Sequence, residues 1–149
     1  MTLIAQTNKQ ATDAHFWYTE STTAEPEVIW NIWTDVANWK QWDIGLKDAG
    51  LSEEFTLNAK GYIIDNDGRK SKFKVTEFEE GISYTYKVPL FLSSLNIKRY
   101  LEVKNGQTYF THEVWFKGIT KGIFVKMLGA EFRQMLPEVL QNIKRLAEQ

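Results

Sequence analysis

Arg99 and His112 are the two residues whose types and spacing could do chemistry together. They lie on two predicted strands joined by Asn105-Gly106, a dipeptide typical of a two-residue type I′ turn. A turn of this length fixes the register, so Arg99 faces His112 directly. A guanidinium keeps its charge in a protein, and its presence disfavours protonation of the neighbouring imidazole. The pair could therefore hold a polar group or transfer a proton.

The face that carries Arg99 and His112 is otherwise apolar. The same register places on it the pairs Leu95 with Phe116, Ile97 with Val114, Leu101 with Phe110, and Val103 with Thr108. The opposite face is polar, because Lys98 falls against Glu113 there. A guanidinium on an apolar face needs an anion or a hydrated cavity.

Two interpretations of Arg99 follow, and both stay open from sequence. Arg99 could pair with Glu131 of the C-terminal helix and simply line a hydrated core. Alternatively, Arg99 and His112 form a polar handle for a ligand carboxylate, phenol or carbonyl, since buried polar groups also concentrate at binding sites.

The Glu80-Gly81 reversal predicts a second hairpin. Pairing outward from it places Val75 opposite Tyr86, Phe73 opposite Val88, and Glu77 opposite Tyr84. Tyr84 and Tyr86 then point to the apolar side, and we expect Glu77 to be a carboxylate at the rim of the sheet. Pro89 predicts a longer loop over residues 89–94.

The remaining elements follow from periodicity. Residues 15–23 suit a strand, Ala24-Glu25-Pro26-Glu27 begins a short helix, and 38–43 form a second helical turn. Residues 45–118 alternate as an antiparallel meander. A helical apolar stripe runs from Ile119 to Leu146 through Ile123 and Met127, with a kink or break expected at Pro137. The pattern predicts an α+β fold whose sheet curls around one long C-terminal helix.

Composition excludes several function classes. The chain of 149 residues has a net charge of −1, which argues against a dedicated nucleic-acid binder. It has no Cys and two His, so we expect no metal site, and no phosphate or dinucleotide loop indicates a cofactor. No stretch resembles a signal peptide or a membrane span. We expect a cytoplasmic protein with a flexible segment at 1–13 and one domain over 14–149.

The segment from Ala24 to Trp30, continued by Trp33-Thr34-Asp35 and by residues 38–42, resembles the start of the polyketide cyclase / START-like (SRPBCC) superfamily. The end, from Phe132 to Glu148, resembles the closing helix of that superfamily. The resemblance implies a helix-grip fold, with about seven antiparallel strands wrapped on a long helix and two short helices after the first strand. It also implies a deep apolar cavity, but it carries over no universal catalytic residues.

We therefore expect an internal cavity that binds a small hydrophobic molecule, lipid-, polyketide- or aromatic-like, with a polar or anionic group. The alternatives are a cofactor-free cyclase, aromatase or dehydratase that uses His112 and Arg99, and a protein-interaction module presenting Phe91 and Leu92. The oligomeric state stays open between monomer and weak dimer. We expect Trp39 and Trp42 near the mouth. The other expected ligand contacts are Tyr84, Tyr86, Arg99, Leu101, Phe110, His112, Phe124, Leu128 and Glu131.

Overall fold

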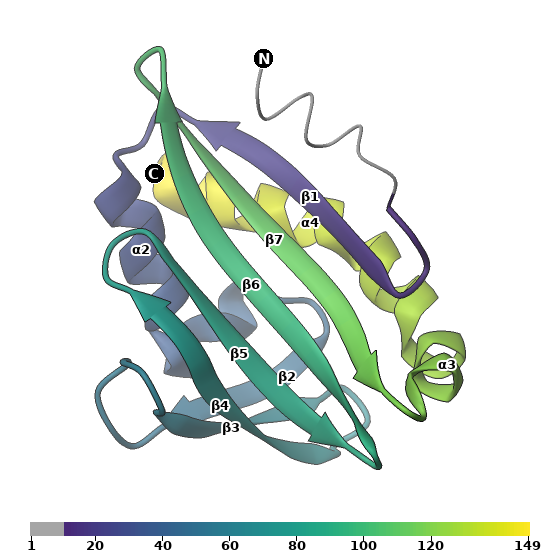
Figure 1. Cartoon of the computed structure of the whole chain (residues 1–149). Coiled ribbons are helices and arrows are strands. Elements are labelled where there is room, and N and C mark those ends of the chain that lie inside the picture. The colour runs from purple at the N-terminus through teal and green to yellow at the C-terminus, as the bar shows by residue number, and fades with distance from the viewer. Residues whose placement is uncertain (1–10) are drawn as a thin grey trace.

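One antiparallel sheet curls around the C-terminal helix in the computed structural model, which describes residues 11–149 (Figure 1). Its seven strands lie in the order β1-β7-β6-β5-β4-β3-β2. The strands are β1 (His15–Thr22), β2 (Leu46–Leu51), β3 (Lys60–Asp65), β4 (Lys70–Glu79), β5 (Ser83–Leu90), β6 (Ser93–Lys104) and β7 (Gln107–Gly118). The predicted α+β architecture is confirmed, whereas most of the predicted flexible segment 1–13 lies outside the described residues.

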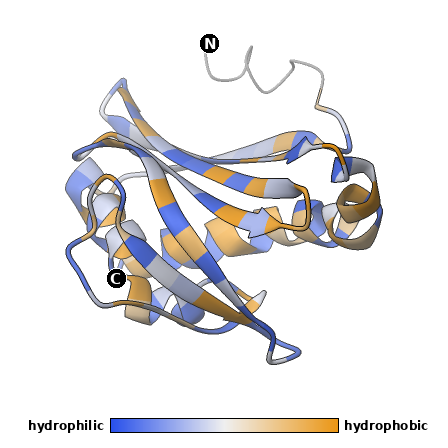
Figure 2. Ribbon diagram, turned by 60° about the horizontal axis from the view of Figure 1, so that its bottom comes forward, coloured by the Kyte–Doolittle hydropathy of each residue, from blue (hydrophilic) through white to orange (hydrophobic). Residues whose placement is uncertain are grey.

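Two short helices follow β1, as predicted. α2 (Pro26–Thr34) begins at Pro26, which suits the first helical turn, and η1 (Val36–Gln41) is a 3₁₀ helix. Together they bury Trp30, Trp33 and Trp39 against the concave face of the sheet. Apolar and polar residues alternate along the strands, and the long helix lies across one face of the sheet (Figure 2).

The β6–β7 hairpin has the predicted register throughout. Arg99 lies opposite His112, Leu101 opposite Phe110, and Lys104 opposite Gln107. The turn residues Asn105 and Gly106 have φ of 53° and 77°, as a type I′ turn requires.

The β4–β5 hairpin differs from the prediction near its turn. Val75 lies opposite Tyr86 as expected, but a bulge before Glu77 shifts the pairing. Glu77 therefore faces Thr85, whose hydroxyl donates to its carboxylate at 2.8 Å, and Phe78 faces Tyr84. The predicted Glu77–Tyr84 pair was wrong because a bulge inserts one residue that turn residues do not reveal.

The predicted loop at 89–94 is also wrong. Pro89 belongs to β5 and pairs with Ser94, and only Phe91 and Leu92 form the reversal. Leu92 takes a positive φ of 56°, an uncommon conformation for a branched aliphatic residue. The β5–β6 connection is therefore a tight, protruding turn.

The C-terminal helical region comprises α3 (Lys121–Phe124), the π-helical turn η2 (Val125–Gly129) and α4 (Ala130–Ala147). α4 continues through Pro137, so the irregular turn lies before α4 and the expected break at Pro137 is absent. The second half of the predicted apolar stripe is buried at Leu136, Val139, Leu140 and Ile143. Ile119, Ile123 and Met127 are instead exposed, because the sheet ends at Gly118 and does not cover them.

Among residues 11–149, no helix combines the length and the apolar character needed to cross a membrane.

Gly61 on β3 marks a close approach between strands. A Cβ there would lie 2.5 Å from the carbonyl oxygen of Gly50 and 2.5 Å from the ring of Phe73. We expect Gly61→Ala to destabilise the fold by about 1–3 kcal/mol through overpacking, measured by urea unfolding. Gly122→Ala is the matched control, because a Cβ at Gly122 meets nothing within 4 Å and Ala is the better helix former. Equal stability of the two variants would contradict this account.

Candidate functional site

Arg99 is the centre of the polar structure inside the sheet. Its side chain points from β6 to the concave face and is 2% exposed. Nη1 donates to the hydroxyl of Tyr84 at 2.7 Å, and Nη2 donates to the hydroxyl of Tyr86 at 3.1 Å. Two neutral phenols on the neighbouring strand β5 therefore accept from a buried cation.

Aromatic faces complete the surroundings of the guanidinium. The Cζ atom of Arg99 lies 4.6 Å from the ring centroid of Trp39 and 4.9 Å from that of Trp42. It lies 5.0 Å from the ring centroid of Tyr86. The quadrupoles of these rings attract a cation, most strongly where water is excluded. The aromatic cage, defined here as Trp39, Trp42, Tyr84 and Tyr86, thus stabilises the charge, and no carboxylate of residues 11–149 forms an ion pair with it.

The cage is tied to the end of helix α2. The Tyr84 hydroxyl donates to the backbone carbonyl oxygen of Trp33 at 2.8 Å, and Nε1 of Trp39 donates to the same oxygen at 2.9 Å. The last carbonyls of a helix lack partners within the helix, and they carry its negative dipole end. The Tyr84 hydroxyl connects this end to Arg99. Burial raises the pKa of Tyr84 to about 12, although the Arg99 charge opposes the shift, so the phenol stays neutral.

His112 lies opposite Arg99 on β7 and is 2% exposed. Burial lowers the pKa of His112 well below its usual value, and the Arg99 charge lowers it further. The imidazole is therefore neutral at physiological pH. Its ring packs against Trp33 and Trp42, with centroids 5.6 and 5.9 Å away.

Asp43, which lies two residues after the 3₁₀ helix, is the carboxyl group that interacts electrostatically with Arg99. Its Oδ1 accepts from the backbone N–H of Gly45 at 2.9 Å. Burial raises the pKa of Asp43, while the Arg99 charge and the Gly45 hydrogen bond oppose the rise. No ion pair joins Asp43 to Arg99 in the described part of the chain, so the interaction acts through space.

A cavity of about 190 Å³ separates the concave face of the sheet from the C-terminal helical region. Asp43, Arg99 and His112 contribute its polar wall. Its apolar walls come from β2, β3, β5, β6, β7, η2 and α4, namely Leu46, Ile63, Tyr86, Val88, Leu90, Leu95, Ile97, Val114, Leu128, Phe132, Met135, Leu136 and Val139.

The structure brings together part of the predicted contact set. Of the predicted residues, Tyr86, Arg99, His112, Leu128 and Glu131 line the cavity. Tyr84, Leu101 and Phe110 are core residues beside it, and Phe124 is half-buried outside it. Trp39 and Trp42 are fully buried around Arg99 and do not stand at the mouth as expected, because the indole faces are used to cover the guanidinium.

The ion pair between Arg99 and Glu131, one of the two open interpretations, does not form. Glu131 is exposed and lines the cavity from α4, while the side-chain hydrogen bonds of Arg99 within the described residues go to the two phenols. Arg99 instead hydrogen-bonds to Tyr84 and Tyr86. The predicted β4–β5 pairing had already placed both tyrosines on the same apolar face as Arg99, so their hydroxyls could have been recognised from sequence as acceptors for the guanidinium.

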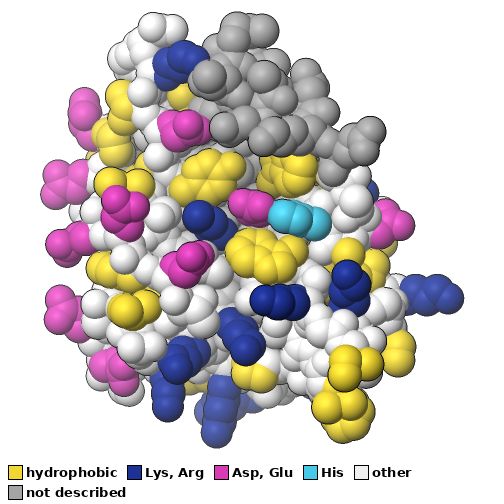
Figure 3. Space-filling view, in the orientation of Figure 1, with side chains coloured by type: hydrophobic (Ala, Val, Ile, Leu, Met, Phe, Trp, Pro, Cys, Tyr) yellow, Lys and Arg dark blue, Asp and Glu magenta, His cyan; other side chains and the backbone are white. Residues whose placement is uncertain are grey.

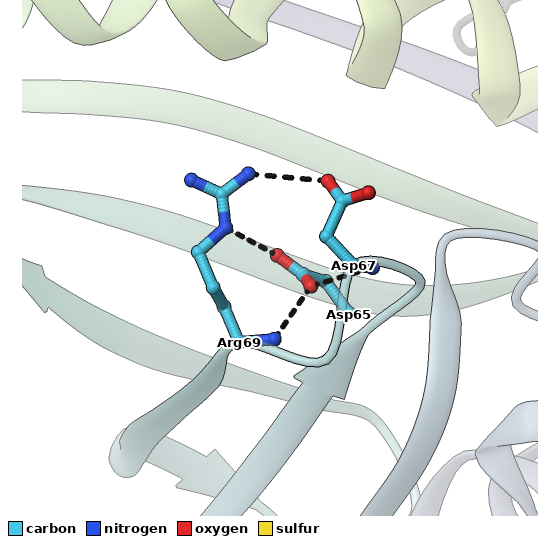
Figure 4. A network of polar contacts seen from close by, with 3 residues as sticks. All are labelled: Asp65, Asp67 and Arg69. Atoms are coloured by element: carbon cyan, nitrogen blue, oxygen red, sulfur yellow. Dashed lines mark hydrogen bonds and ion pairs between the residues drawn. The ribbon is translucent and has the colours of Figure 1, made fainter.

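The turn between β3 and β4 also lines the cavity, which the sequence did not indicate. Arg69 contacts Asp65 at 3.4 Å and Asp67 at 3.2 Å, and its backbone N–H donates to Asp65 Oδ1 at 2.9 Å (Figure 4). Nδ2 of Asn66 donates to the carbonyl oxygen of Ile44 at 2.8 Å, which ties the turn to the segment after η1. Asp65, Asp67 and Arg69 therefore form an ordered polar edge at this side of the cavity.

Within residues 11–149, no three His, Asp or Glu side chains converge in a way that could hold a metal ion.

The lowered pKa of His112 predicts a pH dependence of stability. Below about pH 6.5 the unfolded chain takes up a proton at this imidazole and the folded chain does not, so stability is lost as pH falls towards the folded pKa. The loss should approach about 1.4 kcal/mol per pH unit. Urea unfolding at several pH values should show this loss in the wild type but not in His112→Phe. His15→Phe, which retains His112, should keep it. Identical pH profiles for His112→Phe and the wild type would refute the assignment.

Several solved structures share this fold at low sequence identity. A protein from Arthrobacter aurescens, solved by solution NMR, has a TM-score of 0.71 at 19% identity, with 95% of this chain and 90% of that chain covered. The di-domain ARO/CYC StfQ from the steffimycin biosynthetic pathway has a TM-score of 0.69 at 12% identity, over 91% of this chain and 51% of that chain. DynU16, from the dynemicin biosynthetic locus, has a TM-score of 0.67 at 18% identity, over 92% of this chain and 48% of that chain.

These likenesses establish the fold, and a family model goes further. No curated protein sequence matches the chain. The model described as polyketide cyclase / dehydrase and lipid transport matches residues 14–148, nearly the whole of the described structure. The resemblance noted in the sequence is confirmed, and the chain belongs to the polyketide cyclase / dehydrase and lipid transport family.

Proposed function

We propose that this protein binds, in the cavity beside α4, a small apolar molecule that carries one oxygen-bearing polar group. One observation supports the proposal above others. Nε of Arg99 and Nε2 of His112 are buried and have no hydrogen-bond partner among residues 11–149, and both residues line the cavity. Buried polar atoms in folded proteins are nearly always paired. A ligand oxygen that accepts from Arg99 Nε, and exchanges a hydrogen bond with His112, would satisfy both residues.

The size of the cavity restricts the ligand. A dry cavity of about 150 Å³ can bind benzene, whereas pockets for drug-sized ligands span about 300–1,000 Å³. At about 190 Å³, this cavity suits a single ring with a small substituent or a short branched chain. Val88, Leu95 and Ile97 would contact the apolar part of such a ligand.

The polar wall favours a carbonyl, phenol or carboxylate over a cationic group. The Arg99 guanidinium repels cations, and the neutral His112 has either a donor or an acceptor to offer at Nε2. An ionised Asp43 would repel a negatively charged ligand. Because the pKa of Asp43 is raised, the carboxyl group is protonated more readily and the repulsion is smaller. A neutral carbonyl is the simplest group that matches these contacts.

Acetophenone and ethylbenzene form a matched probe pair, because they differ in the carbonyl oxygen. We expect the wild type to bind acetophenone about 10- to 100-fold more tightly, as one hydrogen bond to a charged donor would provide. Arg99→Met should bring the two affinities close together by weakening acetophenone binding. Titration calorimetry measures both ratios, and native mass spectrometry of the protein as purified would reveal a resident ligand.

Leu128→Trp provides the control for location, because it fills the cavity from the helix side and leaves Arg99 in place. It should weaken both probes equally. If neither probe binds the wild type, or if Arg99→Met leaves the preference for acetophenone unchanged, the proposal fails.

A second function, proton transfer in a cyclase or dehydratase reaction, is favoured by the neutral His112 beside a fixed cation. An imidazole of lowered pKa can accept a proton from the carbon next to a carbonyl, while a guanidinium stabilises the enolate oxygen that forms. The family description, and the origin of StfQ and DynU16 in biosynthetic pathways or loci, support this possibility. We rank it below ligand binding because a neutral imidazole and a fixed cation do not specify which reaction would follow.

Hydrogen–deuterium exchange at the methyl group of acetophenone in D₂O tests this step directly. If His112 acts as a base, NMR should show exchange in the presence of wild-type protein at least tenfold above that in buffer. His112→Phe should abolish the acceleration, and calorimetry on the same variant checks that acetophenone still binds. Acceleration that persists in His112→Phe would exclude His112 as the base, and its absence from the wild type would exclude this function.

A further inference from the structure

We propose that the end of the molecule formed by the β5–β6 turn and the start of the C-terminal helical region docks on an anionic lipid bilayer. The docking surface has an apolar tip, defined as Phe91, Leu92, Ile119, Ile123 and Met127. It also has a basic rim, defined as Lys117, Lys121 and Lys126. The inference is independent of the cavity ligand, because it depends on surface residues that do not line the cavity.

The tip exposes large apolar side chains to an unusual degree. Phe91 is 73% exposed, Leu92 58%, Ile119 89%, and Ile123 and Met127 60% each. These residues come from two segments far apart in sequence. Most other exposed apolar residues, such as Val28, Leu57 and Val103, lie on separate elements, as is normal for a soluble surface. Clustering, not exposure alone, distinguishes the tip.

Hydrogen bonds hold the two segments of the tip together. The backbone N–H of Ile119 donates to the carbonyl oxygen of Leu92 at 3.1 Å, and the Thr120 hydroxyl donates to the carbonyl oxygen of Phe91. Gly118 allows this approach, since a Cβ there would lie 2.5 Å from Ser93 Cα and its φ is 120°. The apolar side chains therefore protrude from a fixed backbone and would not need to be ordered on binding.

The charged residues in the segment that carries Ile119, Ile123 and Met127 are all positive. Between Glu113 and Glu131 the sequence contains Lys117, Lys121 and Lys126 and no acidic residue. All three lysines are exposed, and none forms an ion pair in the part of the chain that the structure describes. Figure 3 shows hydrophobic side chains at this end of the molecule, with Lys and Arg side chains on the adjoining surface.

The basic surface continues onto the sheet. Lys74 and Lys87 are directly opposed on β4 and β5, and both are exposed. Like charges in opposed positions destabilise a sheet, so an anionic partner would relieve this repulsion. The whole chain has a net charge of −1, so the positive charge is local and not a property of the composition.

This combination suits a bilayer better than a nucleic acid or a protein. Protruding apolar side chains can enter the acyl region while lysines around them meet anionic headgroups. A nucleic acid would attract the lysines through its phosphates, but it would not bury the five exposed apolar side chains. The tip also adjoins the cavity. Leu90, directly before Phe91, and Leu128, directly after Met127, both line the cavity. A bilayer bound here would lie beside the ligand cavity.

Vesicle co-sedimentation with the full chain tests the proposal. The probes are vesicles of phosphatidylcholine alone and of phosphatidylcholine mixed with phosphatidylglycerol. We expect binding to the mixed vesicles only, weakened at high salt. Lys121→Gln combined with Lys126→Gln should lower the partition coefficient roughly 30-fold, at about fivefold per charge. Phe91→Ser combined with Ile119→Ser should lower it at least about tenfold.

Matched controls lie elsewhere on the surface. Val103→Ser replaces a residue of similar exposure, 62%, at the β6–β7 turn, and Lys47→Gln removes an exposed charge from β2. Both should bind mixed vesicles as the wild type does. Circular dichroism checks that every variant is folded, and Phe91→Tyr with Ile119→Val replaces the serine pair if that variant is not.

Three outcomes would overturn the proposal. One is that the wild type fails to bind mixed vesicles at low salt. The control variants could lose as much binding as the tip variants. Alternatively, sedimentation velocity could show a dimer that the tip variants dissociate, which would assign the surface to a second copy of the chain. Loss of acetophenone binding with intact vesicle binding would remove the cavity proposal and leave this one standing.

Discussion

A buried guanidinium, with which no carboxylate in the described part of the chain forms an ion pair, constrains the interior of this protein. Arg99 cannot discharge, so the surroundings must stabilise a full positive charge in a region from which water is excluded. They do so with two phenol oxygens, three or more aromatic faces and, through Tyr84, the negative end of helix α2. The positions of β5, of α2 and of the Trp39–Trp42 segment are all coupled to this one side chain.

This arrangement also fixes the chemistry available to the cavity. A directly paired carboxylate would neutralise Arg99 and satisfy its donors, leaving little for a ligand. Phenols accept hydrogen bonds without cancelling the charge, so the potential of Arg99 still reaches the cavity. Burial keeps His112 neutral by lowering its pKa, and the Arg99 charge lowers that pKa further. The same charge opposes the burial that raises the pKa of Asp43. Trp39, Trp42 and Tyr84, which do not line the cavity, thus stabilise the Arg99 charge, while the guanidinium still forms part of the polar wall of the cavity.

Turn dipeptides predicted the fold well where the dipeptide by itself determines the geometry of the hairpin. Asn105-Gly106 strongly favours a two-residue type I′ turn, and from it the register of β6 and β7 and the pairing of Arg99 with His112 followed correctly. Glu80-Gly81 located a turn but could not reveal the bulge before Glu77, because a bulge depends on the curvature of the sheet.

The site was predicted less completely, since its partners come from distant elements. The indoles of Trp39 and Trp42 were visible as a cluster, yet their use as a cover for Arg99 depends on how η1 docks on the sheet. The cavity wall formed by Asp65, Asp67 and Arg69 depends on the position of a turn that looked merely polar. Helical periodicity likewise placed Ile119, Ile123 and Met127 on one apolar stripe, but it could not show where the sheet would stop covering that stripe.

The π-helical turn Val125–Gly129 separates the two uses of the C-terminal helical region. A π turn accommodates one residue more than an α turn, and such turns are frequent at functional sites. Removing one residue there would therefore leave ordinary α geometry and keep the segments on either side in nearly the same orientation. The same deletion inside α4 would rotate one part of the helix against the other by about 100° and turn Leu136 or Ile143 away from the sheet. The π turn is thus a place where related chains can gain or lose one residue while Ile123 at the exposed end and Leu136, Val139 and Ile143 in the core keep the directions in which they face.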